Sequence, residues 1–235
     1  MVRAAKLVTC LLLMHLLKKN TVFSSNYLIL HEDFGSDNAS INIMGIMKNF
    51  LTTLLFIFPL IGNATYCEGR TDKQEIEEII LQITSKYFPN LSSQNILVKE
   101  FNSDAYFLQA KPKISTLVGR RKARKYFVEI NKKLYDCSPG KMALESIIAH
   151  ELIHINDYDR MTVPQIIALA GKYASKKARA KYERDTDKHV VQEGLGEGLI
   201  QYRRWIYQQL TPKELSLKRY YYLTPEEITE LMEPY

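Results

Sequence analysis

The sequence has 235 residues, of which 25% are charged and 46% are hydrophobic, and its formal net charge is +6. This is an ordinary globular composition, long enough to build one domain with its own core. The positive charge is spread along the chain rather than clustered, so we expect no nucleic-acid partner.

The N-terminal part of the chain contains two short apolar runs. The second run, residues 51–61, follows the basic residue Lys48 and leads to the small residue Ala64. A short basic start, an apolar stretch and a small-residue exit are typical of a secretory signal peptide. We therefore expect residues 47–64 to be a signal peptide cleaved after Ala64, and residues 1–46 to be a spurious or additional N-terminal extension.

These features predict that the chain is exported, to the periplasm or the extracellular space. Neither apolar run reaches the roughly 18 residues expected of a membrane-spanning helix. The membrane is an expected partner only if the signal segment is retained as an anchor. The mature protein would then be a single domain, residues 65–235, that contains Cys67 and Cys137. In an oxidising compartment these two cysteines could form a disulfide, and two free buried thiols are the equal alternative.

A helix and three strands are predicted in the first half of this domain. Residues 71–74 resemble a capping box, and isoleucines follow at helical spacing. Residues 95–101 and 105–114 have strand composition and are expected to pair around the turn between them. Residues 126–135 form a third strand. We expect these strands to form a small antiparallel sheet.

The sequence His150-Glu151-Leu152-Ile153-His154 lies in an otherwise uncharged run, on a helix expected from Pro139 to about Asn156. Because His150 and His154 are four residues apart, both imidazoles project from one helix face and could reach one Zn²⁺. Glu151 could hold and deprotonate a water on the metal. Such short motifs also recur by chance. However, a polar triplet in an apolar helix costs several kcal/mol unless something satisfies it.

A catalytic zinc site needs a third protein ligand. Glu183 is the best candidate, on a helix expected over residues 174–192, and Asp187 lies one turn later on the same face. Asp187 could accept the outer N–H of a ligand histidine and set its tautomer. A solvated charged helix face is the alternative interpretation. Asp157 and Asp159 also compete as ligands, although they follow the motif too closely to come from a separate helix.

The motif His150-Glu151-x-x-His154 followed by Glu183-x-x-x-Asp187 resembles the gluzincin metallopeptidases. Its short spacing is similar to that of the minigluzincins and prenyl-CAAX-type endopeptidases, and the resemblance covers roughly residues 126–202. It implies a zincin-like α+β fold with a zinc helix and a glutamate helix. It also implies that the strand just before the zinc helix is an edge strand, whose free backbone groups could pair with an extended peptide. His150, His154 and Glu183 would bind Zn²⁺, Glu151 would be the general base and Asp187 would orient a ligand. The transition-state donor of that family, a His, Tyr or Arg, matches no position that we could identify.

The C-terminal third is predicted to be helical. Residues 193–198 are glycine-rich and are expected to form a hinge or turn, followed by a helix over residues 199–210. Thr211 and Thr224 begin two further capping boxes, each with proline at the first helical position. The sequence thus predicts an exported zinc metallopeptidase acting on a peptide or protein substrate. The alternatives are a zinc hydrolase of a non-peptide bond and a non-catalytic zinc-binding module.

Overall fold

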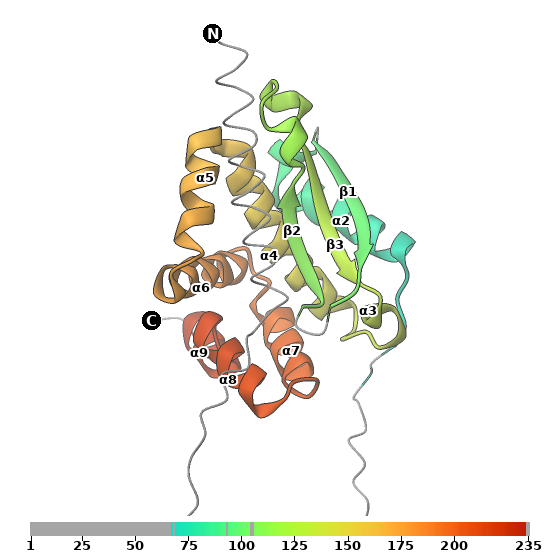
Figure 1. Cartoon of the computed structure of the whole chain (residues 1–235). Helices are drawn as coiled ribbons and strands as arrows, with labels where there is room; N and C mark the ends of the chain where they lie inside the picture. The colour runs from blue at the N-terminus through green and yellow to red at the C-terminus, as the bar shows by residue number, and fades with distance from the viewer. Residues whose placement is uncertain (1–66, 68, 93, 104–105, 234–235) are drawn as a thin grey trace, which may run out of the picture.

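The computed structural model describes residues 67, 69–92, 94–103 and 106–233 (Figure 1). The expected N-terminal extension and signal peptide, residues 1–46 and 47–64, lie outside the described residues. The fold is α+β. Its elements in chain order are α2 (Lys73–Tyr87), β1 (Asn95–Phe101), β2 (Leu108–Pro112), β3 (Lys125–Asn131), α3 (Lys133–Asp136), α4 (Lys141–Arg160), α5 (Val163–Lys172), α6 (Lys176–Gln192), α7 (Gly196–Tyr207), α8 (Pro212–Tyr221) and α9 (Pro225–Met232), with short 3₁₀ turns at Pro89–Leu91, Ile114–Thr116 and Arg121–Ala123.

The sheet has three strands in the order β1-β3-β2, as Figure 1 shows. β1 is parallel to β3, whereas β2 is antiparallel to it, so the sheet is mixed. The predicted antiparallel sheet, with the first two strands paired around their connecting turn, is therefore wrong. The third strand also lies at the centre rather than at the edge, and it ends at Asn131, before a helical turn.

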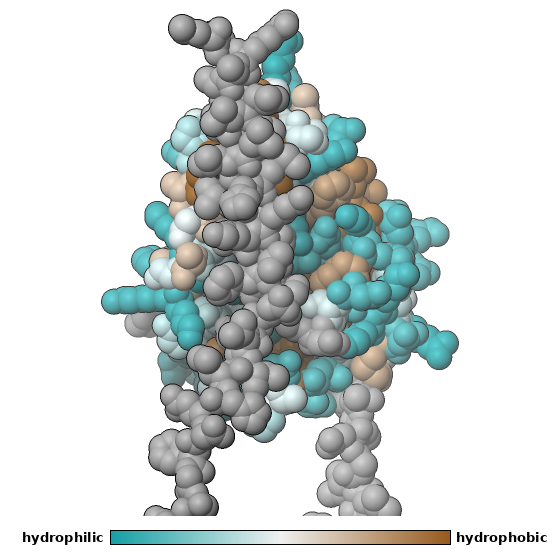
Figure 2. All heavy atoms as spheres, viewed as in Figure 1, coloured by the Kyte–Doolittle hydropathy of each residue, from teal (hydrophilic) through white to brown (hydrophobic). Residues whose placement is uncertain are grey.

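The side chains of β3 explain its central position. Tyr126, Val128 and Ile130 are completely buried on one face of the strand. On the other face, Glu129 lies within 3.9 Å of Lys99 on β1 and 2.9 Å of Lys111 on β2. The buried apolar face of β3 and the lysine partners of Glu129 on both sides are satisfied only when β3 has a neighbouring strand on each side. Over the described part of the view in Figure 2, hydrophilic residues prevail.

Helix α4 is the centre of the core. It contacts α2, β2, α6 and α7, and its residues from Ser146 to Asn156 are all buried. A helix that is buried on nearly every side needs apolar residues all round. Leu144, Ile148, Leu152 and Ile155 form an apolar stripe on one side and are at most 1% exposed, and Ile147 and Ile153 are buried on other sides. The polar residues of α4 therefore lie inside the protein.

Helix α4 begins at Lys141 rather than at Pro139. It also continues to Arg160, past the end expected near residue 156. The guanidinium of Arg124 accounts for the extra turn, because it donates hydrogen bonds to the carbonyl oxygens of Tyr158 (3.0 Å) and Met161 (2.8 Å). A cation at the last carbonyl groups of a helix satisfies them and opposes the helix dipole.

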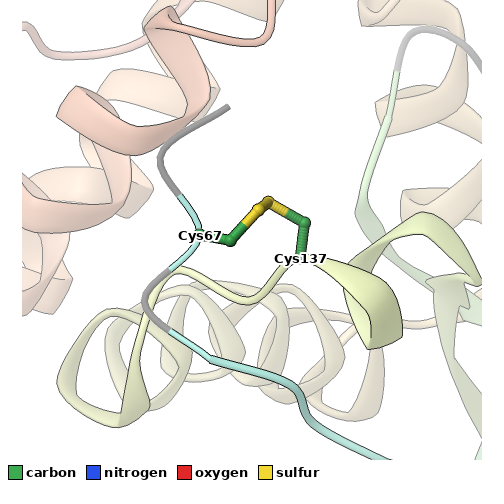
Figure 3. The surroundings of a disulfide bond; sticks show 2 residues. All are labelled: Cys67 and Cys137. Carbon is green, nitrogen blue, oxygen red and sulfur yellow. A yellow bond between two sulfur atoms is a disulfide. The ribbon is translucent and has the colours of Figure 1, made fainter. Parts of the chain in front are cut away.

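A disulfide joins Cys67 to Cys137, across a sequence separation of 70 residues (Figure 3). Next to it, Gly69 and Ser138 form an isolated β-bridge. Of the two alternatives open for these cysteines, the structure contains the paired one. The segment that leads into α2 is thus fastened just before α4 begins.

Three of the remaining helices start with capping boxes, and the sequence predicts two of them. Thr211 and Thr224 begin capping boxes at α8 and α9, and Thr162 begins another at α5. The glycine-rich stretch turns at Gly194, whose φ is +80°, and α7 then starts at Gly196, three residues earlier than residue 199. Among the described helices, none combines the length and the apolar character that a membrane span requires.

Candidate metal centre

His150, Glu151 and His154 lie on α4 and are 2%, 6% and 5% exposed. The four-residue spacing of the two histidines places their rings one turn apart on one face of the helix. Their Nε2 atoms are 3.1 Å apart, and their ring centroids are 4.8 Å apart. Two imidazole nitrogens thus converge on one point inside the protein.

Glu183, on α6, completes this group. Its Oε2 lies 3.2 Å from His150 Nε2 and 3.3 Å from His154 Nε2. The three atoms form a nearly equilateral triangle. Tetrahedral ligands at the usual zinc distances of about 2.0–2.1 Å are separated from one another by about 3.3 Å. The buried group His150, His154 and Glu183 therefore has the spacing and the donor atoms to hold a metal ion.

The charges around the triangle also favour a cation. Burial alone would lower the pKa of His150, but its hydrogen bonds to Asp187 and Glu183 raise that pKa to about 9. Burial alone would likewise raise the pKa of Glu183, but the charge of His154 and the hydrogen bond from His150 hold it well below its ordinary value. Carboxylates thus retain a proton on His150 in the metal-free protein, and a metal ion would take the place of that proton.

Tyr173 holds the second oxygen of the Glu183 carboxylate. Its hydroxyl donates a 3.0 Å hydrogen bond to Glu183 Oε1. Oε2 is therefore the oxygen that faces the two histidines. Tyr173 follows α5 directly, and nothing in the local sequence pattern marked it as part of the site.

Asp187 is completely buried one turn after Glu183. Its Oδ1 lies 2.9 Å from His150 Nδ1, which is the contact that the sequence predicts. With Nδ1–H donated to Asp187, Nε2 is the nitrogen of His150 that faces the centre of the triangle, and it would offer a lone pair there once its proton is lost. Burial would raise the pKa of Asp187, but the charge of Arg203 and the hydrogen bond from His150 lower it.

Arg203 and the backbone of Leu223 hold Asp187 in turn. Arg203 Nη2, on α7, donates to both carboxylate oxygens at 2.8 and 2.9 Å, and the Leu223 N–H donates at 2.9 Å. Arg203 is only 1% exposed. The sequence pattern predicts this helix but not the role of Arg203. The available signal was an arginine on the same buried stripe as Leu199 and Ile206.

The hydrogen-bond partner of Glu151 lies on β2, outside the group formed by the two histidines and Glu183. Glu151 is not part of the metal-binding group, and it accepts a hydrogen bond from the backbone of Ala110 on β2. Burial raises its pKa above the ordinary glutamate value. A buried carboxylate with a raised pKa, beside a possible metal site, is suited to accept a proton.

The rings of Tyr158 and Tyr182 flank His154, with centroids 6.5 and 5.1 Å from its own. The Nδ1 atom of His154 is buried and has no hydrogen-bond partner among the described residues. Aromatic packing rather than a carboxylate therefore orients this second ring.

The two competing carboxylates, Asp157 and Asp159, and one further histidine, His189, lie away from the triangle. Asp157 accepts a hydrogen bond from Tyr182, and Asp159 accepts one from Tyr126. His189, also on α6, pairs with Glu193 at 3.3 Å. None of the three belongs to the metal-binding group found in the described part of the chain.

Comparisons of the chain with protein-family models, with curated proteins and with solved structures give no match in any of the three. The functional argument therefore rests on the geometry of the site.

Proposed function

We propose that this protein is an exported zinc-dependent metallopeptidase of the gluzincin type. The observation that carries the proposal is the triangle formed by His150 Nε2, His154 Nε2 and Glu183 Oε2, whose sides are 3.1–3.3 Å. Two imidazoles and one carboxylate are the ligand set of one class of catalytic zinc site. Bound zinc would supply a Lewis acid and lower the pKa of water at the site toward about 7.

In this proposal Glu151 is the general base. It adjoins His150 in sequence but lies outside the ligand group, and burial raises its pKa. Its carboxylate would take a proton from the attacking water and pass it to the leaving amine. Asp187 would keep His150 in the tautomer that leaves Nε2 free, and Tyr173 would hold Glu183 with Oε2 toward the histidines.

The position of β2 supports a peptide as the substrate. β2 is an edge strand of the sheet and contacts α4, and the backbone of Ala110 reaches Glu151. The outer backbone groups of an edge strand can pair with an extended peptide. A peptide added there would lie beside the proposed base.

The disulfide supports the proposal of export. A bond such as Cys67–Cys137 persists in oxidising compartments and is rare in reducing ones. The proposed signal segment over residues 47–64 accords with that compartment.

The test uses mature protein reconstituted with zinc. We expect one zinc per chain by elemental analysis, and cleavage of a peptide library that stops when a chelator is added. Glu151→Gln should keep the metal and lower hydrolysis by about 100- to 10,000-fold, because it removes a base rather than a ligand. Glu183→Ala should instead weaken zinc binding.

Glu145→Gln, a change elsewhere on α4, is the matched control and should alter neither property. Zinc binding without cleavage of any peptide would reject the peptidase and favour a non-peptide substrate or a non-catalytic zinc module. Failure to bind zinc at neutral pH would reject the whole proposal.

A further inference from the structure

Two cations lie beside the metal-binding group. Arg179 is on α6, four residues before Glu183, so it lies on the same helix face and about 6 Å away along the helix axis. Lys218 is on α8, which packs against α6. Both side chains are partly buried.

Tyrosine rings hold both cations. Arg179 Nη2 donates a 3.2 Å hydrogen bond to the hydroxyl of Tyr106, and its guanidinium carbon lies 4.6 Å from the ring centroid of Tyr221. Lys218 Nζ lies 4.6 Å from the ring centroid of Tyr222 and 5.3 Å from that of Tyr106. Tyr106 thus contacts both cations and brings them to one place.

Neither cation forms a close ion pair among the described residues, although the more distant carboxylate of Glu183 attracts both. No carboxylate there lies within 4.0 Å of either one, and the buried Nε–H of Arg179 has no acceptor. By contrast, Arg203 pairs with Asp187. Burial, followed by the positive charge of Arg203, lowers the pKa of Lys218 to about 8. Two partly buried like charges without a directly paired anion are unfavourable, and an incoming anion would relieve this cost.

The location of the pair indicates which anion it would meet. Tyr106 lies just before β2, the edge strand whose Ala110 backbone reaches Glu151. An extended peptide along β2 advances by about 3.3 Å per residue. Because Tyr106 and Ala110 are four residues apart, a group bound by the cations would lie within about four residues of the bond that is cut.

We propose that Arg179 and Lys218 form a subsite for a carboxylate of the peptide substrate. This inference rests on the proposed peptidase function. Guanidinium and ammonium groups both bind carboxylates through charge-assisted hydrogen bonds. The carboxylate is either the C-terminus of the substrate or an Asp or Glu side chain near the scissile bond, and the two sources share the same chemistry.

The test compares peptides with one common core. One has a neutral side chain and an amidated C-terminus, a second has Glu in place of Gln near the scissile bond, and a third has a free C-terminal acid. At least one carboxylate peptide should have a kcat/KM about tenfold or more above that of the neutral peptide, as expected for a hydrogen bond to a charged group. The peptide that gains identifies the source.

Arg179→Gln and Lys218→Gln should each bring the ratio of acidic to neutral kcat/KM close to one. Lys181→Gln is the matched control, since Lys181 lies on the same helix, is exposed and pairs with Asp185; it should keep the wild-type ratio. Equilibrium binding of the same peptides to Glu151→Gln gives a readout that needs no turnover. There the acidic peptides should bind more tightly, and Arg179→Gln should remove the difference.

Cleavage of all peptides at equal rates, unchanged in Arg179→Gln and Lys218→Gln, would overturn the subsite and leave the peptidase intact. If no peptide is cleaved, the peptidase fails, and the binding measurement alone decides the subsite. Tighter binding of acidic peptides that requires Arg179 would support it, and equal binding of acidic and neutral peptides would overturn it.

Discussion

Asp187→Asn is the sharpest test of how the site is held together. Oδ1 of Asp187 accepts from His150 and Arg203, and Oδ2 accepts from Arg203 and the Leu223 N–H. Asparagine has one oxygen and one NH₂ group. Whichever way the amide is turned, its NH₂ faces two donors and can accept from neither.

The magnitude follows from burial. Arg203 is 1% exposed, so the substitution leaves its charge inside the protein without a carboxylate. Breaking a buried ion pair by removing one partner typically costs about 3–5 kcal/mol. We expect the free energy of unfolding of the metal-free protein to fall by about that amount. Because His150 also loses a fixed tautomer, zinc affinity should fall by roughly 10- to 100-fold.

Denaturant unfolding followed by circular dichroism measures the first quantity, and competition with a chromophoric chelator measures the second. Asp185→Asn is the matched control, since Asp185 lies two residues earlier on α6 and forms exposed ion pairs with Lys181 and Lys188. Such surface pairs contribute about 0–1 kcal/mol. Equal effects of the two substitutions on stability and on zinc binding would refute the idea that a buried network positions His150.

Three further predictions concern packing, covalent linkage and protonation. Gly198→Ala should lower the free energy of unfolding by about 1–3 kcal/mol, because its Cβ would lie 2.3 Å from the carbonyl oxygen of Met142. Gly171→Ala, with no atom within 4 Å of its Cβ, should be neutral or stabilising, and similar losses would contradict the packing argument. Reduction of the Cys67–Cys137 disulfide should lower stability in denaturant melts by up to about 4 kcal/mol, as expected for a loop of 70 residues; an unchanged midpoint would contradict this. Zinc binding at neutral pH should release about one proton, because His150, with a pKa of about 9 in the metal-free protein, is protonated there and must lose that proton. The affinity should then increase with pH up to about that value, and calorimetry in buffers of different ionisation enthalpy that detects no release would show this reasoning to be wrong.

The parts of the site that share one helix could be predicted from the sequence. His150 and His154 are one turn apart on α4, and Glu183 and Asp187 are one turn apart on α6. Helical periodicity alone determines that each pair shares a face. Helical periodicity does not show that the two faces meet; the need of a zinc site for a third ligand and the resemblance to a family suggested it. The apolar stripe of its helix indicates that Arg203 is buried, but its partner Asp187 lies on another helix and could not be assigned from the sequence.

The strand order shows the same limit. Residues 95–101 and 108–112 are separated by a short connection, which favours a hairpin when only local signals are used. The structure inserts β3 between them, because Val128 and Ile130 require burial and Glu129 is matched by lysines on both neighbours. The burial of β3 between two strands therefore outweighed the local preference of β1 and β2 for a hairpin. Because β3 takes the central position, β2 rather than β3 is the edge strand beside Glu151.

The single tryptophan of the chain gives the protein a built-in optical reporter. Trp205 is 2% exposed on α7, two residues after Arg203, and its ring packs against Phe107, with centroids 4.9 Å apart. Phe107 directly precedes β2, so the indole spans the junction between the edge strand and the helix that anchors Asp187. Its emission should be blue-shifted in the native protein and should move to the red when α7 separates from β2. Stopped-flow fluorescence of Trp205 would therefore follow the docking of α7 in real time without any added dye.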